Sequence, residues 1–224
     1  SDPRSCRAMP VGCTAWMIND CAHCFITAGH CCCSSLQVME FNVPFSQSNG
    51  NVVHPPPQDQ YAVDTSSRQS QYVTIGQDWA YFGCFPNSTT GLTPYQAQGQ
   101  AYTLASSPPA YNPSVVIRIT GYGVDSTPNG TYNQIQQAST GPYYYFGGTT
   151  LQYQVDTEGG NSGSCVQWES GGGLAIGIHT NGGCSTSGSG ANSGTGINNA
   201  ALQAAMSNPQ GVCRITASAT VYCT

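Results

Sequence analysis

The sequence predicts an all-β fold, a sandwich or a barrel, that is held together by disulfides. Short apolar runs alternate with turn-forming segments along almost the whole chain, which is the pattern of such folds. A single segment, at residues 199–207, has the composition of a helix. Twelve cysteines among 224 residues, in a chain rich in glycine and serine, indicate up to six disulfides formed in an oxidising compartment.

The predicted strands are short apolar segments bounded by Gly, Asn and Pro. They include residues 14–18, 24–27, 36–41, 72–75, 79–82, 114–122, 143–146, 151–155, 165–168 and 174–179. Asn-Gly pairs at 49–50 and 129–130 supply turns between them. Residues 199–207 predict a short C-terminal helix, because Ala, Leu, Gln and Met are good helix formers.

A polar stretch near the middle of the chain predicts a connector between two halves. It runs from about residue 96 to 113 and contains Pro108 and Pro109. We therefore expect an N-terminal domain at 1–108 and a C-terminal domain at 109–224. Residues 182–196 are rich in Gly, Ser and Asn and predict a flexible surface loop. The tail is expected to return to the body through Cys213 and Cys223.

Charge and hydropathy argue against two classes of partner. Only 7% of the residues are charged, the net charge is −5 and all five basic residues are scattered arginines, so we expect no nucleic-acid binding. No apolar run approaches the roughly 20 residues that span a bilayer, so we expect no membrane insertion. We expect the mature, extracellular form of an exported precursor, and a monomer. Sequons at Asn87 and Asn129 matter only in a eukaryotic host.

Three segments carry residues suited to nucleophilic catalysis. Thr-Ala-Gly-His-Cys at 27–31 places His30 just after an apolar strand, and Asp78 directly precedes the apolar run at 79–82. The third segment, Gly-Gly-Asn-Ser-Gly at 159–163, contains Ser162. Each segment alone is a weak signal, but they occur in the order His, Asp, Ser with gaps of 48 and 84 residues. A serine hydroxyl is a poor nucleophile until a neighbouring imidazole accepts its proton.

Together the three segments resemble the histidine, aspartate and serine motifs of chymotrypsin-like serine proteases. The resemblance implies two packed six-stranded antiparallel Greek-key barrels, with His30 and Asp78 on the first and Ser162 on the second. It implies an endopeptidase that acts on protein and peptide substrates through an acyl-enzyme, without a metal or cofactor. His30 is then the general base and acid, and Asp78 orients it. Backbone N–H groups of Gly160 and Ser162 form the oxyanion hole.

Asp64 is a rival for the role of Asp78. It lies in the polar segment Tyr-Ala-Val-Asp-Thr-Ser-Ser-Arg at 61–68, where a surface aspartate is the simpler interpretation. The apolar strand that follows Asp78 favours a partly buried carboxylate there instead.

The segment Ile-Gly-Ile-His-Thr-Asn at 176–181, with Asn161 before the candidate nucleophile, resembles the glutamyl endopeptidase or V8-like branch of that family. The resemblance implies that His179 contacts an acidic substrate side chain, with Thr157 and Thr180 as further donors. A histidine can donate hydrogen bonds to a carboxylate and becomes a cation when paired with one. The alternative is a core histidine whose ring is satisfied by backbone carbonyls.

Asp156 points to the opposite specificity. It lies six residues before Ser162, where trypsin-like enzymes carry the aspartate that binds Lys or Arg. A carboxylate at the base of the pocket repels an acidic substrate, unless Asp156 caps local N–H groups and points away. The preference for Glu or Asp and the preference for Arg or Lys both stay open, and we favour the former.

The cysteines near His30 admit a zinc site or disulfides. Cys21 and Cys24 have the spacing of zinc ligands. An exported protein seldom keeps thiolates reduced, and using His30 as a ligand disables the base, so disulfides are favoured and no metal is expected. By resemblance, the bridges expected are Cys13–Cys31, Cys165–Cys184 and Cys21–Cys24.

A catalytically dead member of the family, serving as a binding or toxin module, is the competing hypothesis. Its signature is the loss of a triad residue, whereas His30, Asp78 and Ser162 are all present.

Overall fold

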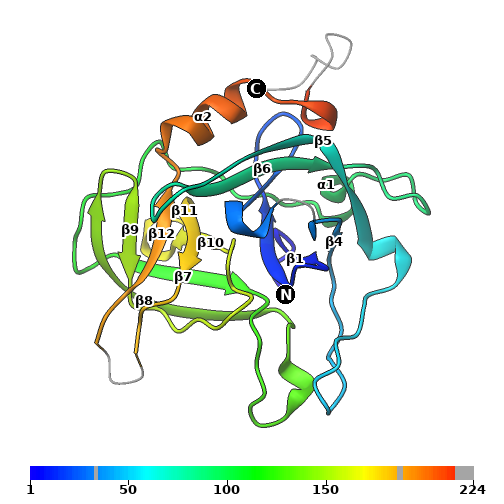
Figure 1. The fold of residues 1–224 in the computed structure, drawn as a ribbon, viewed down its shortest axis with the longest axis horizontal. Helices are drawn as coiled ribbons and strands as arrows, with labels where there is room; N and C mark the ends of the chain where they lie inside the picture. Colours follow the sequence, from blue (N-terminus) through cyan, green and yellow to red (C-terminus); the bar gives the residue numbers. More distant parts are fainter. Residues whose placement is uncertain (33–34, 186–188, 215–224) are drawn as a thin grey trace.

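The strands of the computed structural model, which describes residues 1–32, 35–185 and 189–214, form two closed six-stranded antiparallel barrels (Figure 1). The all-β prediction and the two-barrel expectation are confirmed. The first barrel has the order β1-β2-β3-β6-β5-β4, and the second the order β10-β11-β12-β9-β8-β7. The strands of the first are β1 (Ser5–Met9), β2 (Cys13–Met17), β3 (Phe25–Thr27), β4 (Val38–Glu40), β5 (Gln60–Tyr72) and β6 (Asp78–Cys84). Those of the second are β7 (Val116–Gly121), β8 (Gln137–Gly147), β9 (Thr150–Tyr153), β10 (Cys165–Trp168), β11 (Leu174–Asn181) and β12 (Asn192–Gly196).

Each barrel encloses its own apolar core. In the first, Phe25 stacks on Phe82 with ring centroids 5.6 Å apart and packs against Phe41. In the second, Leu151 and Ile176 are fully buried. Full burial of one such side chain contributes roughly 1.5–3 kcal/mol. Burial of these apolar side chains therefore stabilises both closed barrels.

Two short helices flank the barrels. The predicted C-terminal helix is present as α2 (Ala200–Ser207), where Asn199 accepts hydrogen bonds from the N–H groups of Ala201 and Leu202. A second helix, α1 (Pro94–Gln98), lies where the sequence indicated only a polar connector. Thr93 begins it with a capping box, a device that stabilises even a single turn. No helix within the described ranges is long and apolar enough to cross a membrane.

Two predicted segments differ from the observed structure. Residues 72–75 were expected to form a strand, but β5 ends at Tyr72 and the chain then turns, with Gly76 at a φ of +80°. Val73 and Ile75 are exposed in this turn. Within the loop predicted at 182–196, Asn192–Gly196 is instead the buried strand β12. Residues 186–188 lie outside the described part of the chain.

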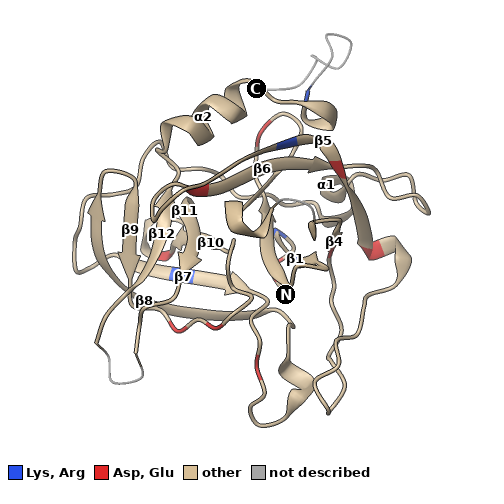
Figure 2. Cartoon of the chain, in the orientation of Figure 1, with Lys and Arg blue, Asp and Glu red and all other residues tan. Residues whose placement is uncertain are grey.

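Charged side chains are sparse on both barrels, and Figure 2 shows the basic positions separated from one another. Within the described residues, ion pairs join Arg4 to Asp2, Arg7 to Glu40 and Arg118 to Glu169. The Arg7–Glu40 pair is buried, and the Arg7 guanidinium also donates to the carbonyls of Val53 and Gln134. Arg7 thereby ties β1 to one long loop of each barrel.

Among the described cysteines, disulfides join Cys13 to Cys31 and Cys24 to Cys213. The expected Cys21–Cys24 pairing is therefore corrected, because Cys24 bonds the C-terminal segment instead. The expected Cys165–Cys184 bridge is also absent, since both residues are free thiols. Cys165 is buried on β10 near Arg4 and Asp2, and this burial raises the pKa of its thiol. Cys33 and Cys223 lie outside the described residues.

Replacing Cys13 and Cys31 together with alanine is expected to lower the free energy of unfolding by about 3 kcal/mol, because the bridge closes a short loop in the unfolded chain. Urea denaturation measures the loss. Cys184→Ala, which removes a free thiol, is the control and is expected to have no such effect. A loss under about 1 kcal/mol in the double variant would contradict the stabilising role of this bridge.

Candidate active site

His30 and Asp78 are brought together by adjacent strands of the first barrel. His30 lies in a 3-10 turn (Gly29–Cys31) directly after β3, and Asp78 begins β6, which pairs with β3. Nδ1 of His30 lies 2.6 Å from Oδ2 of Asp78, and the His30 backbone N–H donates to Oδ1 at 3.0 Å. Asp78 is 2% exposed, and these donors satisfy a carboxylate that is costly to bury alone. One carboxylate thus holds His30 both at its ring and at its backbone.

Asp64 serves a structural role in a different place. Its Oδ1 accepts from the N–H and hydroxyl of Ser66, and its Oδ2 accepts from the N–H of Val212. Burial alone raises the pKa of Asp64, but these hydrogen bonds outweigh it and lower the pKa. Asp64 therefore fastens the segment Gly211–Cys213 to β5 and has no contact with His30 among the described interactions.

Ser162 lies on the loop between β9 and β10 of the second barrel, and that loop is docked onto the first barrel. Thr14 of β2 donates its backbone N–H to the Ser162 carbonyl at 2.9 Å and its hydroxyl to the Gly160 carbonyl at 3.0 Å. The Cys31 sulfur, next to His30 in the chain, lies 3.7 Å from the same Ser162 carbonyl. The part played by Thr14 could not be predicted, because these partners are more than 140 residues away in the chain.

In the segment 160–164 of this loop, two backbone amides are left available. Asn161 N–H donates to the Glu158 carbonyl, Ser164 N–H to that of Asn161, and Gly163 N–H to that of His179. Within the described part of the chain, the N–H groups of Gly160 and Ser162 have no hydrogen-bond acceptor.

Glycine is required at two positions of the loop. Gly160 and Gly163 have φ values of +95° and +89°, which favour glycine. A Cβ on Gly163 would lie 2.1 Å from the Thr27 hydroxyl oxygen, so the close docking of the loop also depends on the missing side chain.

The disulfide Cys13–Cys31 accounts for the cysteines beside His30. The two sulfurs and a ring nitrogen of His30 lie within 4.8 Å of one another. Zinc takes thiolates as ligands, whereas these sulfurs are bonded to each other. This cluster is therefore a bridge beside the imidazole and does not fit a metal.

His179 is buried on β11, with its Nδ1 atom 2.8 Å from the hydroxyl of Tyr153 on β9. Burial, and to a smaller extent the neighbouring His30, lower the pKa of His179 to about 4. The ring is therefore neutral at pH 7. The hydrogen-bond partner of the ring is a tyrosine hydroxyl. The core-histidine alternative of the sequence analysis predicted backbone carbonyls as partners.

The two threonine candidates hold loops together. The Thr180 hydroxyl donates to the side chain of Asn181 and to the Ser193 carbonyl. The Thr157 hydroxyl accepts from the amide of Asn192.

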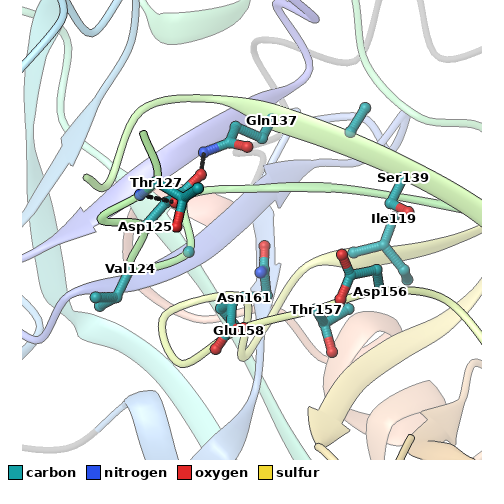
Figure 3. Close-up of a pocket in the computed structure, with 12 residues that line it drawn as sticks. Ile119, Val124, Asp125, Thr127, Gln137, Ser139, Asp156, Thr157, Glu158 and Asn161 are labelled. Carbon is teal, nitrogen blue, oxygen red and sulfur yellow. Dashed lines mark hydrogen bonds between the residues drawn. The ribbon is translucent and has the colours of Figure 1, made fainter. Parts of the chain in front are cut away.

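Asp156 lines a separate cavity of about 460 Å³ between the 156–161 segment and strands β7 and β8 (Figure 3). Figure 3 shows its carboxylate beside Ile119 and Ser139, with Glu158 and Asp125 lining the same cavity. His179 is not among the residues that line it. The structure thus places the two rival specificity residues in different surroundings.

Replacing His179 with glutamine is expected to reduce the pH dependence of stability. The folded-state pKa of about 4 lies below the value of about 6.5 for an unfolded chain, so the unfolded state binds more protons between these values. Stability is full above pH 6.5 and is lost as the pH falls towards 4. The variant is expected to lose about 3 kcal/mol of the difference in unfolding free energy between pH 7 and pH 4.

Urea titrations at the two pH values measure this difference, with Ser107→Ala as the control because Ser107 is exposed and its side chain carries no titratable group in this range. Equal pH dependence in wild type and His179→Gln would contradict the depressed pKa.

Comparison with known proteins finds similarity at the level of structure. No family model matches the chain, and neither does any curated protein. A thermostable serine protease, AL20, from an extremophilic microorganism superposes with a TM-score of 0.66 and 17% identity, over 91% of this chain and 95% of that one. A Glu endopeptidase gives 0.65 and 18%, over 91% and 88%. A mutant of human heparin binding protein gives 0.62 and 15%, over 92% and 90%. The chain has the two-barrel fold of the chymotrypsin-like serine proteases.

Proposed function

We propose that this protein is a secreted serine endopeptidase with Ser162 as nucleophile, His30 as general base and acid, and Asp78 as the residue that orients His30. The observation that carries the proposal is the two-point contact between His30 and the buried carboxylate of Asp78, 2.6 Å at the ring and 3.0 Å at the backbone. A base held in one tautomer and orientation by a third group is the arrangement that activates a serine hydroxyl.

The reaction follows from these groups. The Ser162 hydroxyl oxygen attacks the peptide carbonyl carbon while Nε2 of His30 accepts its proton. The free amides of Gly160 and Ser162 donate to the oxyanion that forms. The C–N bond then breaks as His30 returns the proton to the leaving amine, which gives an acyl-enzyme. Water attacks the ester with His30 again as base, which releases the acid and restores Ser162.

We further propose that the protein prefers Glu or Asp on the carbonyl side of the cleaved bond, and that His179 contacts this acidic side chain. A tyrosine hydroxyl at Nδ1 supports a proton on Nε2, which a neutral ring can donate to a carboxylate. The backbone of His179 forms hydrogen bonds with the backbones of Gly163 and Ser164, so strand β11 adjoins the nucleophile loop. Asp156 lines a cavity that His179 does not line, which supports an acidic substrate at His179. One protein with a similar fold is a Glu endopeptidase.

A peptide-library digest, with cleavage sites mapped by mass spectrometry, tests both proposals. We expect cleavage after Glu or Asp that is lost in Ser162→Ala and loses its acidic preference in His179→Ala but not in the control His54→Ala. Cleavage after Arg or Lys would move specificity to Asp156 while keeping the triad. Cleavage that survives Ser162→Ala would exclude Ser162 as nucleophile.

A further inference from the structure

Thr195 joins the two barrels at the candidate triad. It lies on β12 of the second barrel and is fully buried. Its hydroxyl donates to the Asp78 carbonyl at 2.8 Å and accepts the Asp78 N–H at 3.1 Å. Figure 1 shows β12 passing beside the beginning of β6, where Asp78 lies. One side chain of the second barrel thus satisfies both backbone polar groups of an aspartate in the first.

The other side of Thr195 leads to the nucleophile loop. On β12 it pairs with Ile178 of β11, the residue before His179. His179 in turn accepts the Gly163 N–H at 2.7 Å and donates its own N–H to the Ser164 carbonyl at 2.8 Å. The strand pair β11–β12 therefore holds the loop of Ser162 at one edge and the backbone of Asp78 at the other.

We infer that Thr195 is a positioning residue for the proposed peptidase reaction: its hydroxyl fixes the Asp78 backbone relative to the Ser162 loop. The inference rests on the proposed function. His30 already holds the carboxylate of Asp78, so the contact from the second barrel acts on the Asp78 backbone. A shift of about 1 Å between groups that act together can cost about 100-fold in rate. Thr195 acts through Asp78 and does not contact substrate.

Thr195→Val removes the hydroxyl at nearly constant volume and leaves two buried Asp78 groups unpaired. We expect kcat to fall by about 10- to 100-fold while KM changes less than about threefold. Thr195→Ser keeps the hydroxyl and is expected to stay within about threefold of wild type in kcat. Thr120→Val is the matched control, a buried strand threonine of the same barrel. If the valine variant does not fold, Thr195→Ser and Thr195→Ala differ only by the hydroxyl and give the same comparison.

A second readout does not depend on turnover. The proton NMR signal of His30 Nδ1–H, in its 2.6 Å contact with Asp78, is expected to move in Thr195→Val and to stay in Thr195→Ser and Thr120→Val. The inference is overturned if the valine variant retains the kcat and the signal of Thr120→Val, or if Thr195→Ser is as impaired as Thr195→Val. The wild-type protein could lack peptidase activity while the His30 signal still depends on the Thr195 hydroxyl. This result would contradict the proposed function but support the role of Thr195 in positioning Asp78.

Discussion

Replacing Ser162 with alanine is expected to lower kcat for peptide hydrolysis by about 10⁴- to 10⁶-fold, because the hydroxyl oxygen is the proposed attacking atom. The remaining rate comes from binding and from the oxyanion donors alone, which still accelerate attack by water. KM is expected to change little, since the hydroxyl adds little to ground-state binding. Steady-state kinetics on an acidic peptide substrate measure both quantities.

Ser107→Ala is the matched control for this variant. Ser107 is an exposed serine of the connector between the barrels, and its hydroxyl lies outside the proposed machinery. Its loss is expected to leave kcat within about twofold of wild type, as for most surface substitutions. A Ser162→Ala protein that keeps more than about a tenth of wild-type kcat would assign the nucleophile to another group.

Replacing Asp78 with asparagine is expected to lower kcat by about 10⁴-fold with the fold preserved. The amide fills the same space but cannot accept from both the ring and the backbone of His30 as a carboxylate does. The imidazole then favours the tautomer that presents a proton to Ser162, so it no longer accepts one. Single-turnover kinetics with an ester substrate isolate the acylation step.

Asp64→Asn separates the two aspartates that the sequence offered for this role. Asp64 contacts Ser66 and Val212, so the substitution is expected to lower stability by about 1–3 kcal/mol and to change kcat by less than about threefold. A larger loss of kcat in Asp64→Asn than in Asp78→Asn would reverse the assignment.

The fold class and the His30–Asp78 contact could be predicted because their signals are local. Each residue lies at the end of an apolar strand, and the order of the motifs along the chain limits the topology. The strand β12, Asn-Ser-Gly-Thr-Gly, could not be predicted, since it contains no apolar residue yet is buried throughout. Its small residues allow neighbours to approach closely: a Cβ on Gly194 would lie 2.3 Å from the Ile178 carbonyl. This requirement exists only in the assembled barrel.

Contacts between residues far apart in the chain could likewise not be predicted from the sequence. Cys24 bonds Cys213 across 189 residues, and nothing in the composition near either cysteine selects the other. Strand β5 was hidden for a different reason. Most of its exposed residues are polar, and the buried ones include Asp64 and Ser67 as well as Tyr61, so the apolar alternation is interrupted. The contact of Thr195 with Asp78 joins residues 117 positions apart and depends on how the two barrels pack.

In the proposed mechanism His30 activates Ser162, and a fluorophosphonate probe detects this activation. The probe reacts with a serine hydroxyl whose proton a neighbouring base accepts. Tryptic mapping of the labelled wild-type protein is predicted to recover the label on Ser162, and labelling is predicted to be lost in His30→Ala. Folded wild-type protein that carries no label on Ser162, or equal labelling of Ser162 in His30→Ala, would contradict the account and favour a non-catalytic binding protein with this fold.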